Sequence, residues 1–89
     1  MRETRWPDET FQHYVMRVYQ QRGYVQTSLE LLALGICEEA GEVAAAVLDL
    51  NPDFKQKEGR EPSMLYHELM DLLVYVCALA NAAGYDLRI

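Results

Sequence analysis

Apolar residues near the start of the chain recur with the spacing of a one-sided helix. Their intervals of three and four residues place them on one face of an α-helix: Phe11, Tyr14, Val15, Val18 and Tyr19. Pro7, with two acidic residues after it, favours a helix start, and Gly23 favours a helix end. The pattern predicts a first helix over about residues 8–22, preceded by a loose arm at residues 1–6.

A second, longer apolar run opens with the capping-box sequence Thr27–Glu30. A helix is predicted from there to Leu50, because the polar sequence Asn51–Asp53, with its central proline, stops it. The apolar residues of this run cover most of the helix circumference, which is typical of a helix buried on several sides. Gly35 and Gly41 each lower helix propensity by about 1 kcal/mol relative to Ala. Either a close approach of another group or a tight helix crossing explains them.

A third apolar run follows a polar connection at residues 51–62, which is rich in turn formers and is predicted to be a mobile loop. The third helix is predicted to begin near Pro62 or Ser63 and to end near Ala83, with Gly84 as its C-terminal cap. No stretch alternates as a strand would, and no segment repeats. The sequence therefore predicts a single all-α domain that spans the whole chain, residues 1–89.

The two long helices need more partners than the short first helix offers. Eighty-nine residues form one small domain that buries little apolar surface alone. Cys37 and Cys77 lie in apolar helical patterns, so we expect each thiol to act as a small hydrophobic group. We expect a reducing compartment and no disulfide between them. We expect a second copy of the chain to complete a four-helix-bundle-type core, as a homodimer or a dimer of dimers.

Net charge and hydropathy narrow the class of partner. A formal charge of −6 argues against nonspecific binding to nucleic acid, whose phosphates it would repel. Carboxylates interrupt the longest apolar run before it reaches the roughly 18 residues of a membrane span, and the first residues contain no apolar signal core. We therefore expect a cytoplasmic protein with no membrane or nucleic-acid partner. A small phosphate ligand is compatible with this charge when a metal ion accompanies it.

Two short acidic stretches interrupt the long apolar helices. The first contains Glu38, Glu39 and Glu42, and the second contains Glu68 and Asp71. At about 100° per residue, each stretch places carboxylates three or four residues apart on neighbouring parts of one helix face. Antiparallel packing of the two helices would bring the two carboxylate groups opposite each other across a groove. Such an all-oxygen site suits Mg²⁺ or Mn²⁺.

Ordinary solvated helix faces are the alternative explanation for these carboxylates. That alternative is weakened because like charges three and four residues apart repel each other when they are unpaired. No His or Cys stands at the spacing of a zinc site, and the Glu-x-x-His pair of di-iron bundles is absent. The metal-site interpretation is therefore preferred.

With their flanking residues, the two acidic stretches resemble the motifs of a known family. Residues 34–43 (LGICEEAGEV) resemble the first block of the MazG-like nucleotide pyrophosphohydrolases, within the all-α nucleoside triphosphate pyrophosphatase group. Residues 67–75 (HELMDLLVY), together with residues 78–80 (ALA) and 84–87 (GYDL), resemble the second block. The resemblance covers about residues 29–87.

This resemblance implies Mg²⁺-dependent hydrolysis of a (deoxy)nucleoside triphosphate to the monophosphate and pyrophosphate. Cleaning of the nucleotide pool is one role for such an enzyme. By motif position, the resemblance makes Glu39, Glu42, Glu68 and Asp71 the metal ligands. Glu38 would be a metal-associated residue or would orient the attacking water.

The end of this sequence departs from the family pattern. Family members usually continue into a further helix whose basic and amide residues contact the phosphates, whereas this sequence stops at Arg88-Ile89. Phosphate contacts are therefore expected from Lys55, Lys57 and Arg60 in the polar connection, or from Tyr75 one turn after the second acidic stretch. The alternative for the three cationic side chains is that they only keep the polar connection soluble. The alternative for Tyr75 is that it packs in the core.

Two further functions stay open on this sequence. A truncated relative of the family would bind nucleotide or metal without turnover. A helical interaction protein without any ligand would explain the apolar helices but not the acidic stretches.

Overall fold

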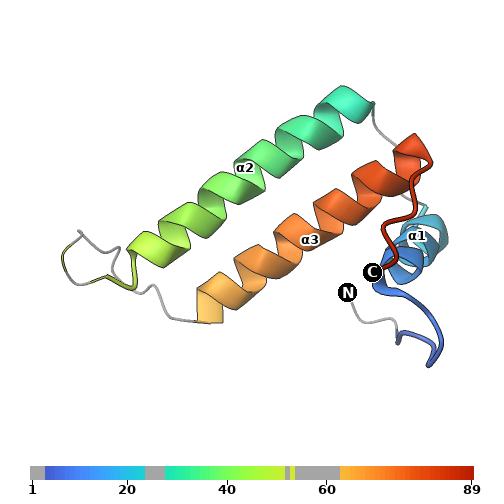
Figure 1. Cartoon of the computed structure of the whole chain (residues 1–89), viewed down its shortest axis with the longest axis horizontal. Coiled ribbons are helices and arrows are strands. Elements are labelled where there is room, and N and C mark those ends of the chain that lie inside the picture. The colour runs from blue at the N-terminus through green and yellow to red at the C-terminus, as the bar shows by residue number, and fades with distance from the viewer. Residues whose placement is uncertain (1–3, 24–27, 52, 54–62) are drawn as a thin grey trace.

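The computed structural model describes residues 4–23, 28–51, 53 and 63–89. Within these residues the chain forms three helices and no strand: α1 (Phe11–Gln21), α2 (Leu29–Leu48) and α3 (Ser63–Ala83). The helices α2 and α3 run antiparallel, side by side, and α1 lies against the C-terminal half of α3 (Figure 1). The prediction of an all-α fold is confirmed for the described part of the chain.

The first helix begins three residues later than the sequence predicts. Thr10 is the N-cap of α1, and its hydroxyl oxygen accepts a hydrogen bond of 3.2 Å from the amide of His13. Pro7 and Asp8 form a turn before this cap, so the predicted start at residue 8 is wrong. The end is as predicted, because Gly23 follows α1 in the left-handed region at φ +68°.

Glu9 holds the segment before α1 instead of joining the helix. Its buried carboxylate accepts hydrogen bonds of 2.8 and 2.9 Å from the guanidinium of Arg17, and a third of 3.2 Å from the amide of Trp6. Arg17 also donates to the carbonyl of Thr4 and stacks 4.2 Å from the Trp6 ring centroid. The described part of this segment is thus held against α1, in contrast to the loose arm expected at residues 1–6.

Ser28 caps the second helix. Its hydroxyl accepts a hydrogen bond of 3.2 Å from the amide of Leu31, whereas Thr27, the predicted cap, lies outside the described residues. The helix ends at Leu48, two residues before the predicted Leu50. This shortening reflects a tighter last turn, in which the amide of Leu50 bonds three residues back at 3.1 Å.

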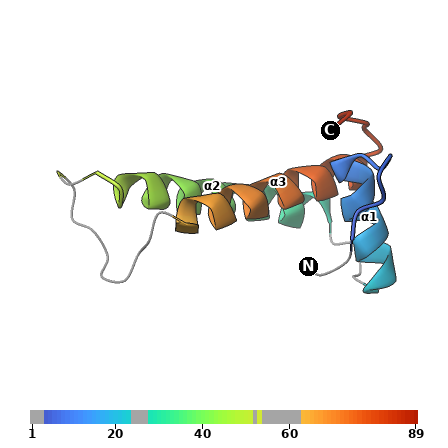
Figure 2. The ribbon, with the colours of Figure 1, turned by 90° about the horizontal axis from the view of Figure 1, so that it is seen from below.

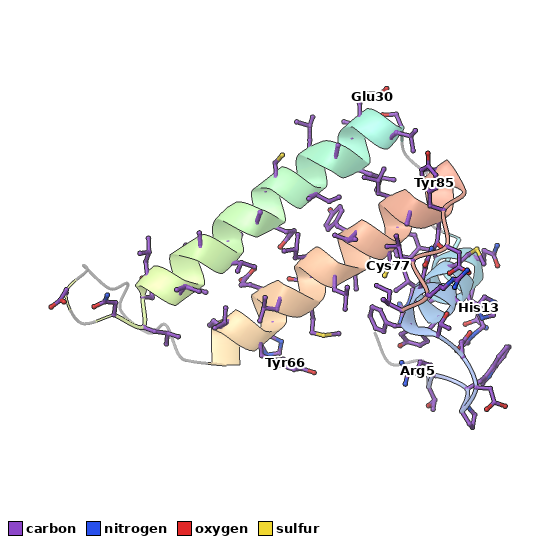
Figure 3. All side chains as sticks on the ribbon, in the orientation of Figure 1. Arg5, His13, Glu30, Tyr66, Cys77 and Tyr85 are labelled. Carbon is purple, nitrogen blue, oxygen red and sulfur yellow. The ribbon has the colours of Figure 1, made fainter. Side chains whose placement is uncertain are left out.

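The core lies where α1 crosses α3. The side chains of Val15, Val18 and Cys77 are fully buried there, and Cys77 points from α3 toward α1 (Figure 3). The third helix ends at Ala83, and Gly84 at φ +82° forms the predicted C-terminal cap. The position of α1 therefore depends on α3, which also packs against α2 along its length.

The residues after α3 return over α1 and are bound by one buried side chain, Gln12. Its amide nitrogen donates to the carbonyl of Tyr85 at 2.6 Å and to the side chain of Asn81 at 2.9 Å. Its side-chain oxygen accepts from the amide of Leu87 at 2.7 Å, and its backbone amide donates to the carbonyl of Ile89 at 2.8 Å. Because every polar atom of this side chain is satisfied, the C-terminal segment is fixed against α1.

The α2–α3 pair forms a single layer, with α1 at one end of it (Figure 2). In the isolated chain, Leu32 and Ala46 are the residues of α2 that are buried, so this helix is covered on one side only. The radius of gyration is 15.0 Å, against about 12 Å expected for a compact domain of this length. Large apolar side chains are exposed on both long helices: Leu31, Leu34, Tyr66 and Leu69.

The two cysteines differ in their surroundings. Both are free thiols, with Cys77 buried and Cys37 exposed on α2. The burial of Cys77 fits the role of a small hydrophobe, whereas the thiol of Cys37 faces solvent in the single chain.

Candidate metal centre

Antiparallel packing of α2 and α3 brings the two acidic stretches together. One carboxylate oxygen from each of Glu39, Glu68 and Asp71 lies within 4.8 Å of the others. Glu39 and Glu68 are half-buried, and Asp71 is exposed at the edge of the group. These three residues are called the carboxylate cluster below. The two helices supply them jointly, as the spacing of the acidic stretches predicts.

The surroundings of Glu39 disfavour its negative charge. Burial raises the pKa of Glu39 above its ordinary value of 4.5, and the neighbouring carboxylates Asp71 and Glu68, then Glu38 and Glu42, raise it further. Among the described residues, no Lys or Arg forms an ion pair with the cluster. The cluster is thus a site of concentrated negative charge, which a cation would stabilise.

The donor set of the cluster fits a hard divalent cation. Its three ligand atoms are carboxylate oxygens from helices that hold them at short separation, and oxygen-only sites select Mg²⁺, Mn²⁺ or Ca²⁺ over softer metals. His67, beside Glu68 in the sequence, does not belong to the group. Its ring instead meets that of Tyr66 edge-on, with centroids 5.8 Å apart.

Two of the predicted site residues lie outside the cluster. Glu42 is exposed and contributes no oxygen to the group of three. Its position three residues after Glu39 turns it by about 60° around α2, which accounts for its greater exposure to solvent. Glu38 is exposed as well. The roles of Glu42 as a ligand and of Glu38 as a catalytic group stay predictions.

The predicted phosphate contacts fall into two groups. Lys55, Lys57 and Arg60 lie outside the described residues. The ring of Tyr75 packs against α2 at Gly35, where an added Cβ would come within 2.7 Å of the ring carbon Cδ1. This contact agrees with the packing alternative for Tyr75.

The two glycines of α2 therefore have different explanations. Gly35 makes a close approach, one of the two explanations that its position in the helix allows, and no sequence pattern identifies Tyr75 as the partner. A Cβ added at Gly41 would meet no described atom within 4 Å. Packing among the described residues therefore does not explain why glycine, with its low helix propensity, stands at position 41.

Fold and site together define a class of protein: an all-α domain in which two antiparallel helices bring together three carboxylates, a donor set that fits a divalent cation. In a comparison with protein families, the model of the MazG nucleotide pyrophosphohydrolase domain matches residues 26–89, which include both acidic stretches. The chain belongs to this family, and the resemblance found in the sequence is confirmed. No curated protein and no solved structure was found to match the chain. None of the helices described here is both long and apolar enough to cross a membrane.

Proposed function

We propose that this protein hydrolyses a (deoxy)nucleoside triphosphate to the monophosphate and pyrophosphate, with Mg²⁺ as its cofactor. One observation carries the proposal: Glu39, Glu68 and Asp71, from two helices, converge within 4.8 Å in a member of a nucleotide pyrophosphohydrolase family. A structural role alone does not explain three adjacent carboxylates, because their repulsion opposes the packing of α2 on α3.

Each carboxylate has a role in this proposal. Glu39, Glu68 and Asp71 bind the cation through their oxygens, and Glu42 adds a ligand from the exposed side of α2. Glu38 orients the attacking water. When bound, Mg²⁺ neutralises phosphate charge and lowers the pKa of a coordinated water. Phosphoryl chemistry depends mainly on positioning and charge stabilisation, and the rigid helices supply the positioning.

Cations of the protein complete the proposed substrate site. Lys55, Lys57 and Arg60 stand in the sequence between the two acidic stretches, and we assign the phosphate contacts to them. Tyr75 is assigned to packing, because its ring lies against Gly35. Substitution of the three cations with Gln should raise KM for the nucleotide and leave metal affinity unchanged.

A second copy of the chain covers the exposed apolar face of α2 and α3 in this proposal. Leu34 and Tyr66 are each 64% exposed, and Leu31 is 58% exposed. Complete burial of one such side chain contributes about 1.5–3 kcal/mol. Sedimentation velocity should give a dimer, or a dimer of dimers, for the wild type. Leu34→Glu should shift the protein toward monomer, whereas Leu87→Glu, at an exposed leucine of the C-terminal segment, should not.

The test of the activity is a panel of ribo- and deoxyribonucleoside triphosphates, standard and non-standard, with Mg²⁺ and a pyrophosphate readout. Glu39→Gln and Asp71→Asn should each abolish release of pyrophosphate. Glu30→Gln, in the first turn of α2 (Figure 3) and outside the cluster, should not. Preference for non-standard nucleotides would support a role in nucleotide-pool cleaning. Calorimetric binding of nucleotide with no turnover would support the alternative of a binding protein, and unaltered turnover in both variants would contradict the proposed site.

A further inference from the structure

A very close contact between α2 and α3 lies at Gly35. An added Cβ there would stand 2.7 Å from Cδ1 and 3.0 Å from Cζ of Tyr75, and nearer still to Cε1. Separations under 3.0 Å are ones that real Cβ atoms essentially never show. The Tyr75 ring therefore rests directly on the backbone of α2, and only glycine leaves room for it. Gly41, with open space around it among the described residues, shows no such requirement.

This contact is one helical turn away from the carboxylate cluster on both helices. Glu39 follows Gly35 by four residues on α2, and Asp71 precedes Tyr75 by four residues on α3. Four residues correspond to about 6 Å along a helix. Because the helices are antiparallel (Figure 1), the turn next to the Gly35–Tyr75 contact is the one at which Glu39 meets Asp71.

The cluster tolerates little change in the separation of the helices. Oxygens on opposite sides of a Mg²⁺ ion lie roughly 4 Å apart, since each metal–oxygen distance is about 2.0–2.1 Å. The cluster already places its three oxygens within 4.8 Å. Mutual repulsion of the carboxylates favours a wider separation when no cation is bound. A rigid contact one turn away can resist that widening.

We propose that Gly35 and Tyr75 act as a positioning pair, a spacer that sets the separation of α2 and α3 at the carboxylate cluster and so determines its metal affinity. The inference rests on the proposed metal site. Tyr75 does not touch the cation in this account. Its ring fixes the helix backbone that carries Glu39, as residues behind the ligands do in metal sites generally.

The test is a titration of the full-length chain with Mn²⁺ alone, followed by the loss of the free-ion electron paramagnetic resonance signal. Gly35→Ala should weaken Mn²⁺ binding about tenfold or more, because the new methyl group forces the ring and the helix apart. Tyr75→Phe keeps the ring and should stay within about twofold of the wild type. Gly41→Ala is the matched control, because its methyl group meets open space, and it should also leave the affinity unchanged.

A double-mutant cycle separates positioning from a general loss of structure. In the Tyr75→Ala background, Gly35→Ala should alter the Mn²⁺ affinity by less than about twofold, because the ring that it would strike is gone. If circular dichroism shows that the Gly35→Ala variant is unfolded, the Mn²⁺ affinities of Tyr75→Ala and Tyr75→Phe are compared instead. The first should weaken binding about fivefold or more and the second should not.

The outcomes distinguish this inference from the proposed function. A wild type that binds no Mn²⁺ overturns the proposed metal site and the spacer with it. A wild type that binds Mn²⁺ with the same affinity as folded Gly35→Ala overturns the spacer alone. Equal effects of Gly35→Ala with and without the Tyr75 ring overturn it as well.

Discussion

Replacing Glu39 with Gln should stabilise the metal-free protein. The substitution keeps the shape of the side chain and removes one charge from a group of three oxygens that lie within 4.8 Å of one another. At that separation each carboxylate pair repels by about 1 kcal/mol in water. Glu39 takes part in two pairs, which gives about 2 kcal/mol. Counterions at physiological salt, with a screening length of about 8 Å, roughly halve this to about 1 kcal/mol.

The same substitution should abolish stabilisation by Mg²⁺. A cation present at about 100 times its Kd stabilises a folded protein by about 2.7 kcal/mol, and the variant lacks one of its ligands. The order of stability should therefore reverse: Glu39→Gln above the wild type without metal, and below it with saturating Mg²⁺. No structural role for Glu39 in packing predicts such a reversal.

Acid pH supplies a second readout for Glu39. Its pKa in the folded protein is raised above 4.5, so the folded state binds a proton more readily than the unfolded state. This preference contributes to the free energy of unfolding. The contribution is fully present below pH 4.5 and is lost as the pH rises through the raised pKa of Glu39. The metal-free wild type should show this loss relative to Glu39→Gln, which has no proton to release there.

The assay is thermal and urea unfolding at one protein concentration, with EDTA and then with Mg²⁺. A stabilisation of 1 kcal/mol should raise Tm by about 4–8 °C in a domain of this size. Glu30→Gln is the matched control. It removes an exposed carboxylate from the first turn of α2, so it should lower stability by less than about 1 kcal/mol and leave the Mg²⁺ response intact. A Glu39→Gln protein that is less stable than the wild type in EDTA would show that Glu39 is not destabilised by its neighbours. A Glu39→Gln protein that responds to Mg²⁺ as the wild type does would show that Glu39 is not a ligand.

Three further results are expected outside the carboxylate cluster. The arginine partner lowers the pKa of Glu9 from 4.5 to about 2, so the wild type should lose stability between pH 4.5 and about pH 2 in urea titrations, and Glu9→Gln should lack this loss. Gln12→Ala should lower the free energy of unfolding by about 1–3 kcal/mol and speed hydrogen exchange at the amide of Leu87, its partner. Burial also raises the pKa of Cys77, so a thiol reagent should modify only the exposed Cys37 until the protein unfolds.

Helical periodicity was sufficient to predict the three helices, because apolar stripes and caps are local features. The predicted start of α1 is too early because Pro7 favours a helix start there, whereas the side chains of Glu9 and Thr10 determine the actual start. Thr10 caps the helix, and Glu9 turns instead toward Arg17, eight residues later. A pattern of neighbouring residues does not predict the Glu9–Arg17 ion pair, because this pair depends on how the segment before α1 packs against the helix.

For the candidate site, the sequence predicts that the two acidic stretches lie on two helices and face each other. The spacing within each acidic stretch placed Glu39 on one helix face and Glu68 with Asp71 on another, and antiparallel packing brings these three together. The sequence could not specify the rotation of α2, which leaves Glu42 exposed. Rotation and register depend on side-chain packing between the helices, and the packing of the Tyr75 ring against the helix backbone becomes visible only in three dimensions.

We expect the carboxylate cluster to support cleavage of a nucleoside triphosphate between its α- and β-phosphates. Phosphorus-31 NMR of the wild-type protein with a substrate nucleotide tests it most directly, because the two possible bond cleavages give different products. Signals of the nucleoside monophosphate and pyrophosphate should appear with Mg²⁺ and should be absent with EDTA. Signals of orthophosphate and nucleoside diphosphate, or product formation that continues in EDTA, would contradict it.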